Sequence, residues 1–276
     1  MDTVVITGAT AGIGLECAAQ LAPGRHLVLV GRNEEKLRTA ARRIGAAGAA
    51  RVDTLTADFS SLDSVRTLSE QVRAEYQRID VLINNAGSVN AKRIETVDGY
   101  EATFAVNHLA PYLLTETVKP LLVAGAPARI VFTASTGHYR GTMDFDDLQY
   151  RSGYSIMKAY SRSKLANVLY TRSLAAELAG TGVTVNALHP GVVATDIWNR
   201  APAIARPLLS VLKRAVMVSP EEGGRRVAYL AADPAVATIT GEYFEDNRIR
   251  QPSELARDPS VAQQLRSVSD QLAGLA

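Results

Sequence analysis

The sequence of 276 residues has little cysteine, almost no excess of charge and no long hydrophobic run. Its single cysteine, Cys17, excludes a disulfide within the chain and is typical of a reducing compartment. The 30 Lys and Arg residues nearly balance the 28 Asp and Glu residues, which leaves a net charge of +2, and the cations are scattered. A nucleic-acid-binding surface needs a concentrated basic patch, so nucleic acid is not an expected partner.

The lack of long hydrophobic runs bears on membranes and secretion. No stretch of about 18 or more apolar residues occurs, so no integral membrane segment is expected. The apolar positions start at Val4 and reach Gly8 almost at once, which leaves no space for a signal peptide. Both absences predict a cytoplasmic protein.

What the chain does contain is an alternation of short β-branched runs with longer segments rich in Ala and Leu. Strands are expected at 4–6, 26–30, 51–56, 81–83, 129–132 and 183–185, and helices at 34–44, 62–76, 100–122 and 159–178. This alternation implies right-handed crossovers and an α/β fold, a doubly wound parallel sheet with helices on both faces. No Pro/Ser-rich linker divides the chain, so residues 1–276 are expected to form a single domain.

A glycine-rich segment lies between the first expected strand and the first helix. It reads Thr7-Gly8-Ala9-Thr10-Ala11-Gly12-Ile13-Gly14. Glycines let the main chain turn sharply and approach a pyrophosphate, whose charge then faces the amino end of a helix. A tight turn without a ligand is the alternative, because three residues separate the first two glycines and such patterns have false positives. The residues expected to bind a dinucleotide here are Gly8, Thr10, Ala11, Gly12, Ile13 and Gly14.

The end of the second expected strand predicts which dinucleotide binds. An acidic residue about 20 residues beyond the glycines would bind the ribose 2′-hydroxyl of NAD(H). Arg32 stands there instead. A guanidinium pairs with a 2′-phosphate and stacks on adenine, whereas its alternative role is that of a solvent-facing cation. Arg32 therefore predicts NADP(H).

Two Tyr/Lys pairs have a spacing of four residues, Tyr160 with Lys164 and Tyr154 with Lys158. On a helix, this spacing places both side chains on one face. An ammonium beside a phenol lowers the phenol pKa from its usual value of roughly 10, as acid–base catalysis near neutrality requires. The two tyrosines would lie roughly 240° apart around one helix, so only one pair can serve a given site.

Together, the glycine segment, Asn84-Asn85-Ala86-Gly87, Ser135 and a Tyr-x-x-x-Lys pair resemble the short-chain dehydrogenase/reductase family over nearly the whole chain. In that family a serine shortly precedes the tyrosine. Ser135 lies 25 residues before Tyr160 and 19 before Tyr154, and the segment after Tyr160 looks like the family's active helix. We therefore choose Tyr160 and Lys164. Segments around Asn107, His138, Phe145 and His189 are similar to the branch of retinol dehydrogenases and WW-domain oxidoreductases, although the chain lacks that branch's amino-terminal membrane segment and carries Ser161-Arg162 within the motif.

The resemblance implies a Rossmann-type sheet of about seven strands and reversible hydride transfer between NADP(H) and a carbonyl or alcohol substrate, with reduction as the expected direction. Tyr160 would be the proton donor in reduction and the base in oxidation. Lys164 would hold the nicotinamide ribose and tune Tyr160. Ser135 would bind the substrate oxygen, and Asn107 would keep a water-mediated proton path open to Lys164.

The resemblance also implies further contacts and self-association. Asp58 would contact the adenine, Asn85 and Gly87 the adenosine side, and Thr195 the nicotinamide carboxamide. Asn85 could instead simply close a turn. Homo-oligomers are common in the family, through the long helices at 100–122 and 159–178.

Residues 202–218 occupy the position of the family's substrate-covering region. Apolar residues recur there at helical spacing, namely Ile204, Leu208, Leu209, Leu212 and Val216. We expect an amphipathic lid over an apolar pocket, and hence a lipophilic substrate. The alternatives are a surface helix packed on the core and docking to a membrane surface.

No metal site is expected, because Asp144, Asp146 and Asp147 have no histidine or carboxylate partner at ligand spacing, so a capped loop is favoured. His108, His138 and His189 are interpreted as packing and hydrogen-bonding residues.

Two other functions stay open. One is a non-catalytic NADP(H)-sensing protein of the same fold, but such proteins typically lack the Tyr/Lys pair that this chain has. The other is a related epimerase or dehydratase, but those enzymes usually carry a larger carboxy-terminal substrate domain than the residues after Gly191 could form.

Overall fold

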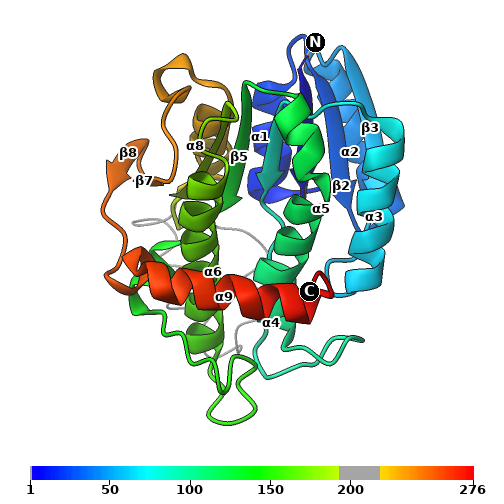
Figure 1. Ribbon diagram of the computed structural model, residues 1–276. Coiled ribbons are helices and arrows are strands. Elements are labelled where there is room, and N and C mark those ends of the chain that lie inside the picture. Colours follow the sequence, from blue (N-terminus) through cyan, green and yellow to red (C-terminus); the bar gives the residue numbers. More distant parts are fainter. Residues whose placement is uncertain (1, 193–217) are drawn as a thin grey trace.

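Eight strands form one sheet in the computed structural model, which describes residues 2–192 and 218–276 (Figure 1). The strand order is β3-β2-β1-β4-β5-β6-β7-β8, parallel throughout except for the β7–β8 pair. The strands are β1 Thr3–Thr7, β2 His26–Gly31, β3 Arg51–Thr56, β4 Val81–Asn84, β5 Ala128–Thr133, β6 Val183–His189, β7 Tyr243–Glu245 and β8 Arg248–Arg250. The predicted doubly wound sheet is confirmed, with seven parallel strands and one antiparallel strand that was not predicted.

The antiparallel strand β8 arises from a two-residue hairpin. Asp246 and Asn247 both have positive φ values, 49° and 59°. Two-residue turns whose backbone twist matches that of the strands require such values. Asp and Asn tolerate this backbone conformation better than most residues. The hairpin therefore follows from local turn chemistry.

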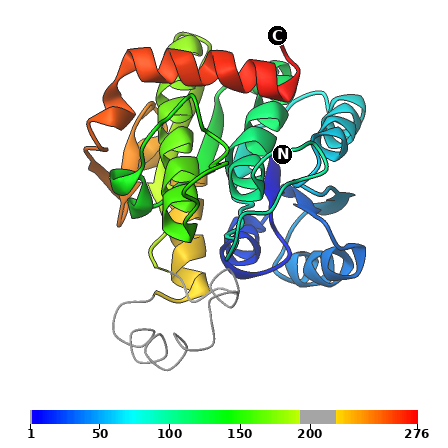
Figure 2. The same ribbon diagram turned by 90° about the horizontal axis from the view of Figure 1, so that it is seen from below.

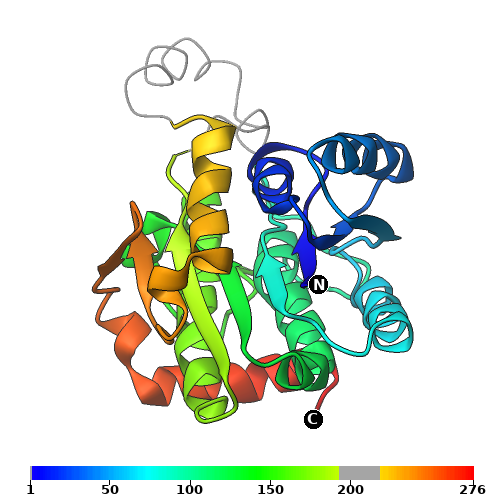
Figure 3. The same cartoon turned by 90° about the horizontal axis from the view of Figure 1, so that it is seen from above.

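Helices cover both faces of the sheet, as Figure 3 shows from above. The helices of one face are α1 Gly12–Leu21, α2 Glu34–Ala46 and α8 Pro220–Ala232, and those of the other are α3 Leu62–Glu75, α5 Ala110–Ala124 and α6 Ile156–Glu177. Successive strand residues point to opposite faces, so Val4 and Ile6 of β1 enter one hydrophobic core while Val5 enters the other.

The helix expected at 100–122 contains a π-helical turn. A short helix α4, Ala102–Phe104, is followed by a π-helical turn, η1, Ala105–Leu109, and then by α5. Pro111 lies in the first turn of α5, four residues after Asn107. It has no N–H to donate to the Asn107 carbonyl, and in a regular helix its ring would clash with that carbonyl. The turn widens to relieve this conflict. The helix predicted at 100–122 is therefore confirmed, since residues 102–124 are helical throughout, but its π-helical turn was not predicted.

The carboxy-terminal helix α9, Pro259–Ala273, lies across α5 and α6 (Figures 1 and 2). Tyr112 of α5 donates a 2.6 Å hydrogen bond to Asp270, and Arg266 bridges Glu116 of α5 and Glu177 of α6 at 3.1 and 2.5 Å. The helices that we expected to mediate self-association are thus partly covered within the same chain.

Two of the expectations concern residues outside the described ranges. Thr195 and nearly all of the expected lid, 202–217, lie outside the described residues. Among the described residues, no helix has the length and hydropathy needed to cross a membrane.

Candidate active site

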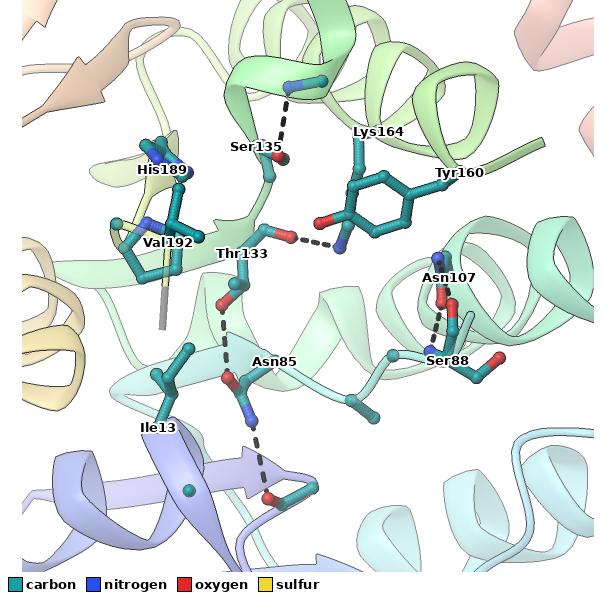
Figure 4. Close-up of a pocket in the computed structure, with 18 of the residues that line it drawn as sticks. Ile13, Asn85, Ser88, Asn107, Thr133, Ser135, Tyr160, Lys164, His189 and Val192 are labelled. Carbon is teal, nitrogen blue, oxygen red and sulfur yellow. Dashed lines mark hydrogen bonds between the residues drawn. The ribbon is translucent and has the colours of Figure 1, made fainter. Parts of the chain in front are cut away.

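A pocket of about 1010 Å³ opens at the carboxyl ends of the central strands, where the chain order reverses between β1 and β4. Ligands bind at this position in doubly wound sheets. The predicted residues that line it are Gly8, Ala11, Gly12, Ile13, Gly14, Arg32, Asn85, Gly87, Asn107, Ser135, Tyr160 and Lys164. The structure thus brings residues from six regions of the sequence to one cavity (Figure 4).

The glycine segment forms one end of this pocket. Gly8 has a φ of +67°, and a side chain at Gly14 would lie 2.4 Å from the Gly8 carbonyl oxygen, so both positions need glycine. Helix α1 starts at Gly12 after Ala11, which offers no side-chain cap. Helices α2, α3, α6, α8 and α9 are instead capped by the side chains of Asn33, Ser61, Ser155, Ser219 and Asp258. The uncapped end of α1 at the pocket fits an anionic group such as a pyrophosphate.

Asn85 braces the glycine segment from β4. Its main-chain N–H donates to the Thr7 side chain at 2.9 Å, and its side-chain amide donates to the Thr7 carbonyl at 3.0 Å. The side chain at position 85 therefore closes the turn, which was the alternative to its predicted role. Its contact with an adenosine stays a prediction.

Arg32, exposed at the end of β2, lines the pocket and makes no hydrogen bond or ion pair with any described residue. Thr10 and Asp58 do not line it. The Thr10 methyl lies 2.7 Å from where a side chain on Gly31 would begin, so Thr10 packs against Gly31. The Asp58 carboxylate accepts hydrogen bonds from Ser60 at 2.9 and 2.8 Å. Ligand contacts of Thr10 and Asp58 stay predictions.

Ser135, Tyr160 and Lys164 meet at the opposite end of the pocket (Figure 4). Ser135 follows β5, and its hydroxyl oxygen accepts a 3.0 Å hydrogen bond from the Gly137 N–H and is hydrogen-bonded to Tyr160. Lys164 is 5% exposed, and its Nζ donates to the Thr133 carbonyl at 2.7 Å. A hydroxyl pair beside a fixed ammonium is suited to moving a proton to or from a substrate oxygen.

The electrostatics of this trio differ from the expectation in one respect. Burial raises the pKa of Tyr160 above its ordinary value, and the Ser135 hydrogen bond only opposes that shift. Lys164 lies 5.7 Å from the centre of the Tyr160 ring and donates to a carbonyl, and burial lowers its own pKa to about 8. The net shift of the Tyr160 pKa is therefore upward, because burial outweighs the opposing Ser135 hydrogen bond.

Asn107 lies next to this trio, in the π-helical turn. Its Oδ1 accepts a 2.7 Å hydrogen bond from the Ser88 N–H, and its Nδ2 donates to the Ser88 carbonyl and to Ser163, both at 3.0 Å. A side chain on Gly87 would contact Asn107 Oδ1 at 3.3 Å and Lys164 Nζ at 3.8 Å. Glycine at this position keeps the space in front of Lys164 open.

The second Tyr/Lys pair lies outside the pocket. Tyr154 precedes α6, and its hydroxyl donates a 2.7 Å hydrogen bond to the Asn90 carbonyl, while Lys158 is exposed. Neither residue lines the cavity, which agrees with the choice of Tyr160 and Lys164.

Several lining residues were not foreseen from the sequence. Thr133 acts through its main-chain carbonyl, a group that every residue carries and that no motif can mark. At the Ser135 end, exposed apolar side chains of Tyr139, Met157 and Val192 lie at the cavity, together with His189. Among the described residues, no group of three metal-ligating side chains lies together. Asp144 and Asp147 instead cap main-chain N–H groups of their loop.

Comparison with known proteins agrees with this geometry. The family model of short chain dehydrogenases matches residues 2–204. Human retinol dehydrogenase 14 is 38% identical over 99% of this chain and 86% of its own. The crystal structure of an uncharacterised protein from Mycobacterium paratuberculosis is 30% identical, covers 99% of this chain and 94% of its own, and has a TM-score of 0.80. A structure of a variant of actinorhodin polyketide ketoreductase with NADPH is 30% identical over 88% of this chain and 94% of its own, with a TM-score of 0.70. The chain belongs to the short-chain dehydrogenase/reductase family, whose members are oxidoreductases that use nicotinamide cofactors.

Proposed function

We propose that the protein reduces apolar ketones or aldehydes with NADPH and catalyses the reverse oxidation. The observation that carries this proposal is the placement of Ser135, Tyr160 and Lys164 at one end of a cavity whose other end is the uncapped amino terminus of α1. A nicotinamide dinucleotide, when bound, supplies or accepts the hydride. The chain's own residues then need only orient the carbonyl and move one proton.

Each of the three side chains has a distinct task in this proposal. The Tyr160 hydroxyl donates a proton to the substrate oxygen during reduction, and its burial, which keeps the phenol protonated, suits an acid. Ser135 hydrogen-bonds the same oxygen and orients it. Lys164 binds the ribose hydroxyls, and its ammonium together with an oxidised nicotinamide would stabilise the phenolate that alcohol oxidation requires.

Arg32 supports the choice of NADP(H) over NAD(H). It is a cation at the cavity whose guanidinium is not engaged by a described acidic residue. A planar guanidinium is suited to the 2′-phosphate that distinguishes the two cofactors. The NADPH in the actinorhodin ketoreductase structure is consistent with this choice.

The substrate end favours an apolar compound. Tyr139, Met157 and Val192 are 43, 48 and 38% exposed, and exposed apolar side chains beside a cavity favour lipophilic ligands. The resemblance to retinol dehydrogenases supports the same substrate class. The expected lid at 202–218 and the carboxamide contact of Thr195 belong to this proposal, as does a cytoplasmic location, for which the free thiol of Cys17 is suited.

The test is a screen of the purified protein with NADPH and a panel of ketones and aldehydes of increasing apolar size. The loss of NADPH absorbance measures turnover. We expect turnover that increases with apolar size. Binding of NADPH without turnover on any carbonyl would instead indicate a cofactor sensor. Conversion of a substrate without net NADPH consumption would indicate an epimerase or a dehydratase.

A further inference from the structure

The buried carbonyl of Asn107 has an unusual partner. In a regular helix it would accept the N–H of residue 111, but Pro111 has none. Asn107 is 1% exposed, and a buried carbonyl requires a donor. The side-chain amide of Asn167, on α6, donates to this carbonyl at 2.9 Å. A side chain from another helix thus substitutes for the missing main-chain donor.

This bond fixes the direction of a longer chain of hydrogen bonds. The Nδ2 of Asn167 donates to a carbonyl, so the Oδ1 of Asn167 is the atom that lies 3.2 Å from His108 Nδ1. Because Oδ1 can only accept a hydrogen bond, His108 Nδ1 must carry the proton. His108 Nε2 is then an acceptor and receives the hydroxyl proton of Ser269, on α9, at 3.0 Å. The chain therefore runs from Ser269 through a neutral His108 and Asn167 to the Asn107 carbonyl.

The same elements hold the active-site side chains. Asn167 lies seven residues after Tyr160 and three after Lys164, so the three share one face of α6. Asn107, whose carbonyl Asn167 holds, uses its side chain to bind Ser88 and Ser163, and Ser163 donates to the Tyr160 carbonyl at 2.8 Å. A shift of the π-helical turn would therefore move the wall that faces Lys164.

We propose that Asn167 and His108 are positioning residues of the active site, which hold the Asn107 turn against α6 and connect it through Ser269 to α9. The proposal rests on the proposed function for its kinetic consequences, but not for the geometry of the network. Neither side chain lines the cavity, so both act through Asn107.

The first test reads the network directly and needs no turnover. Two-bond proton–nitrogen NMR spectra of the 15N-labelled protein report which ring nitrogen of a histidine carries the proton, and the chain has only four histidines. We expect His108, assigned by its loss in His108→Asn, to be neutral at pH 7 with the proton on Nδ1. A proton on Nε2, or a doubly protonated ring, would overturn the proposal.

The second test separates positioning from folding. Asn186→Leu is a matched control, since Asn186 is also a buried asparagine whose amide donates to a main-chain carbonyl, that of Ile239, at 2.6 Å. For Asn167→Leu we expect kcat to fall by about ten- to 100-fold, with NADPH affinity from fluorescence titration within about threefold of wild type, because sub-ångström misplacement costs rate more than binding. Asn186→Leu should keep kcat. Equal kcat values for the two variants would overturn the proposal.

Rescue at position 108 distinguishes the two ring nitrogens. His108→Asn keeps a donor at the place of Nδ1, whereas His108→Gln keeps a polar group only at the place of Nε2. We expect His108→Asn to retain more of the wild-type kcat than His108→Gln, and the reverse order would contradict the assigned direction. If the wild-type protein reduces no carbonyl, the proposed function fails, while the NMR test still decides whether the network exists.

Discussion

Lys164 Nζ, on α6, donates a 2.7 Å hydrogen bond to the main-chain carbonyl of Thr133, at the end of β5. The sheet and the helix thereby fix the position of the ammonium before any ligand binds. The side chain is almost fully buried, and this burial favours its neutral form. The burial that comes with this position therefore makes the charge of Lys164 sensitive to pH near 8.

We expect kcat/KM for NADPH to fall as the pH rises above about 8. Burial lowers the pKa of Lys164 from 10.5 to about 8, so the ammonium that would bind the ribose is present below this pH and is lost above it. The measurement is the pH profile of kcat/KM, which reports groups of the free enzyme. Arginine does not titrate in this range. In Lys164→Arg we therefore expect a lower kcat/KM that no longer declines near pH 8. A wild-type profile that stays flat to pH 10 would contradict this expectation.

Replacement of Arg32 should change cofactor preference. In Arg32→Asp the 2′-phosphate of NADPH meets a carboxylate, so we expect the ratio of kcat/KM for NADPH over NADH to fall by about 100-fold, as the loss of a charge-assisted pair together with a new repulsion implies. Arg42→Asp makes the same charge change on the exposed surface of α2, away from the cavity, and serves as the control. A similar fall in both variants would show that overall charge, not a contact at Arg32, sets the preference.

The sequence allowed much of the sheet and site to be predicted, because the relevant signals are local. Strand–helix alternation identified β1 to β6. Gly8 and Ser135 were expected after strands and Tyr160 on a helix, which placed all three at one edge of a parallel sheet. The π-helical turn was missed although Pro111 lies four residues after Asn107, a signal that could have revealed it.

Other features depend on contacts between residues far apart in the sequence. The position of α9 follows from pairs such as Tyr112 with Asp270, 158 residues apart, and no periodicity encodes such a pairing. The partners of Lys164 and Asn107 include main-chain groups of Thr133 and Ser88, which leave no trace in side-chain motifs. The pKa of Tyr160 depends on burial as well as on its neighbours, and spacing alone reports only the neighbours.

Acid should destabilise the protein in part through His108. Burial among the rings of Phe104, Tyr112 and Tyr170 lowers the pKa of His108 from 6.5 to about 4. The unfolded chain therefore binds this proton at a higher pH than the folded protein, so stability is lost as the pH falls from about 6.5 to about 4, by about 3 kcal/mol.

The measurement for this acid effect is urea unfolding at pH 7 and at pH 4.5. His108→Asn removes the titrating ring, and its free energy of unfolding should fall less between the two pH values than that of wild type. All other acid-sensitive groups are common to both proteins, so their contributions cancel in this comparison. Equal losses in both proteins would rule out a contribution from His108.

The position of α9 leads us to expect a monomer rather than the oligomer that the family resemblance implied. Association through α5 and α6 would require α9 to release the ion pairs of Arg266 and the hydrogen bond between Tyr112 and Asp270. Size-exclusion chromatography with light scattering should therefore give the mass of one chain, 29.5 kDa. A mass twice as large at micromolar concentration would show that another face mediates association or that α9 moves.

The central claim is that Tyr160, and not the other tyrosine of like spacing, moves the proton. The most direct measurement compares kcat for NADPH-dependent carbonyl reduction in Tyr160→Phe and Tyr154→Phe, which remove one hydroxyl each from the same part of the chain. We expect kcat to fall by about 1000-fold in Tyr160→Phe, as loss of a general acid implies. In Tyr154→Phe kcat should stay within about twofold, because the Tyr154 hydroxyl donates to the Asn90 carbonyl outside the cavity. Full turnover by Tyr160→Phe would contradict the account.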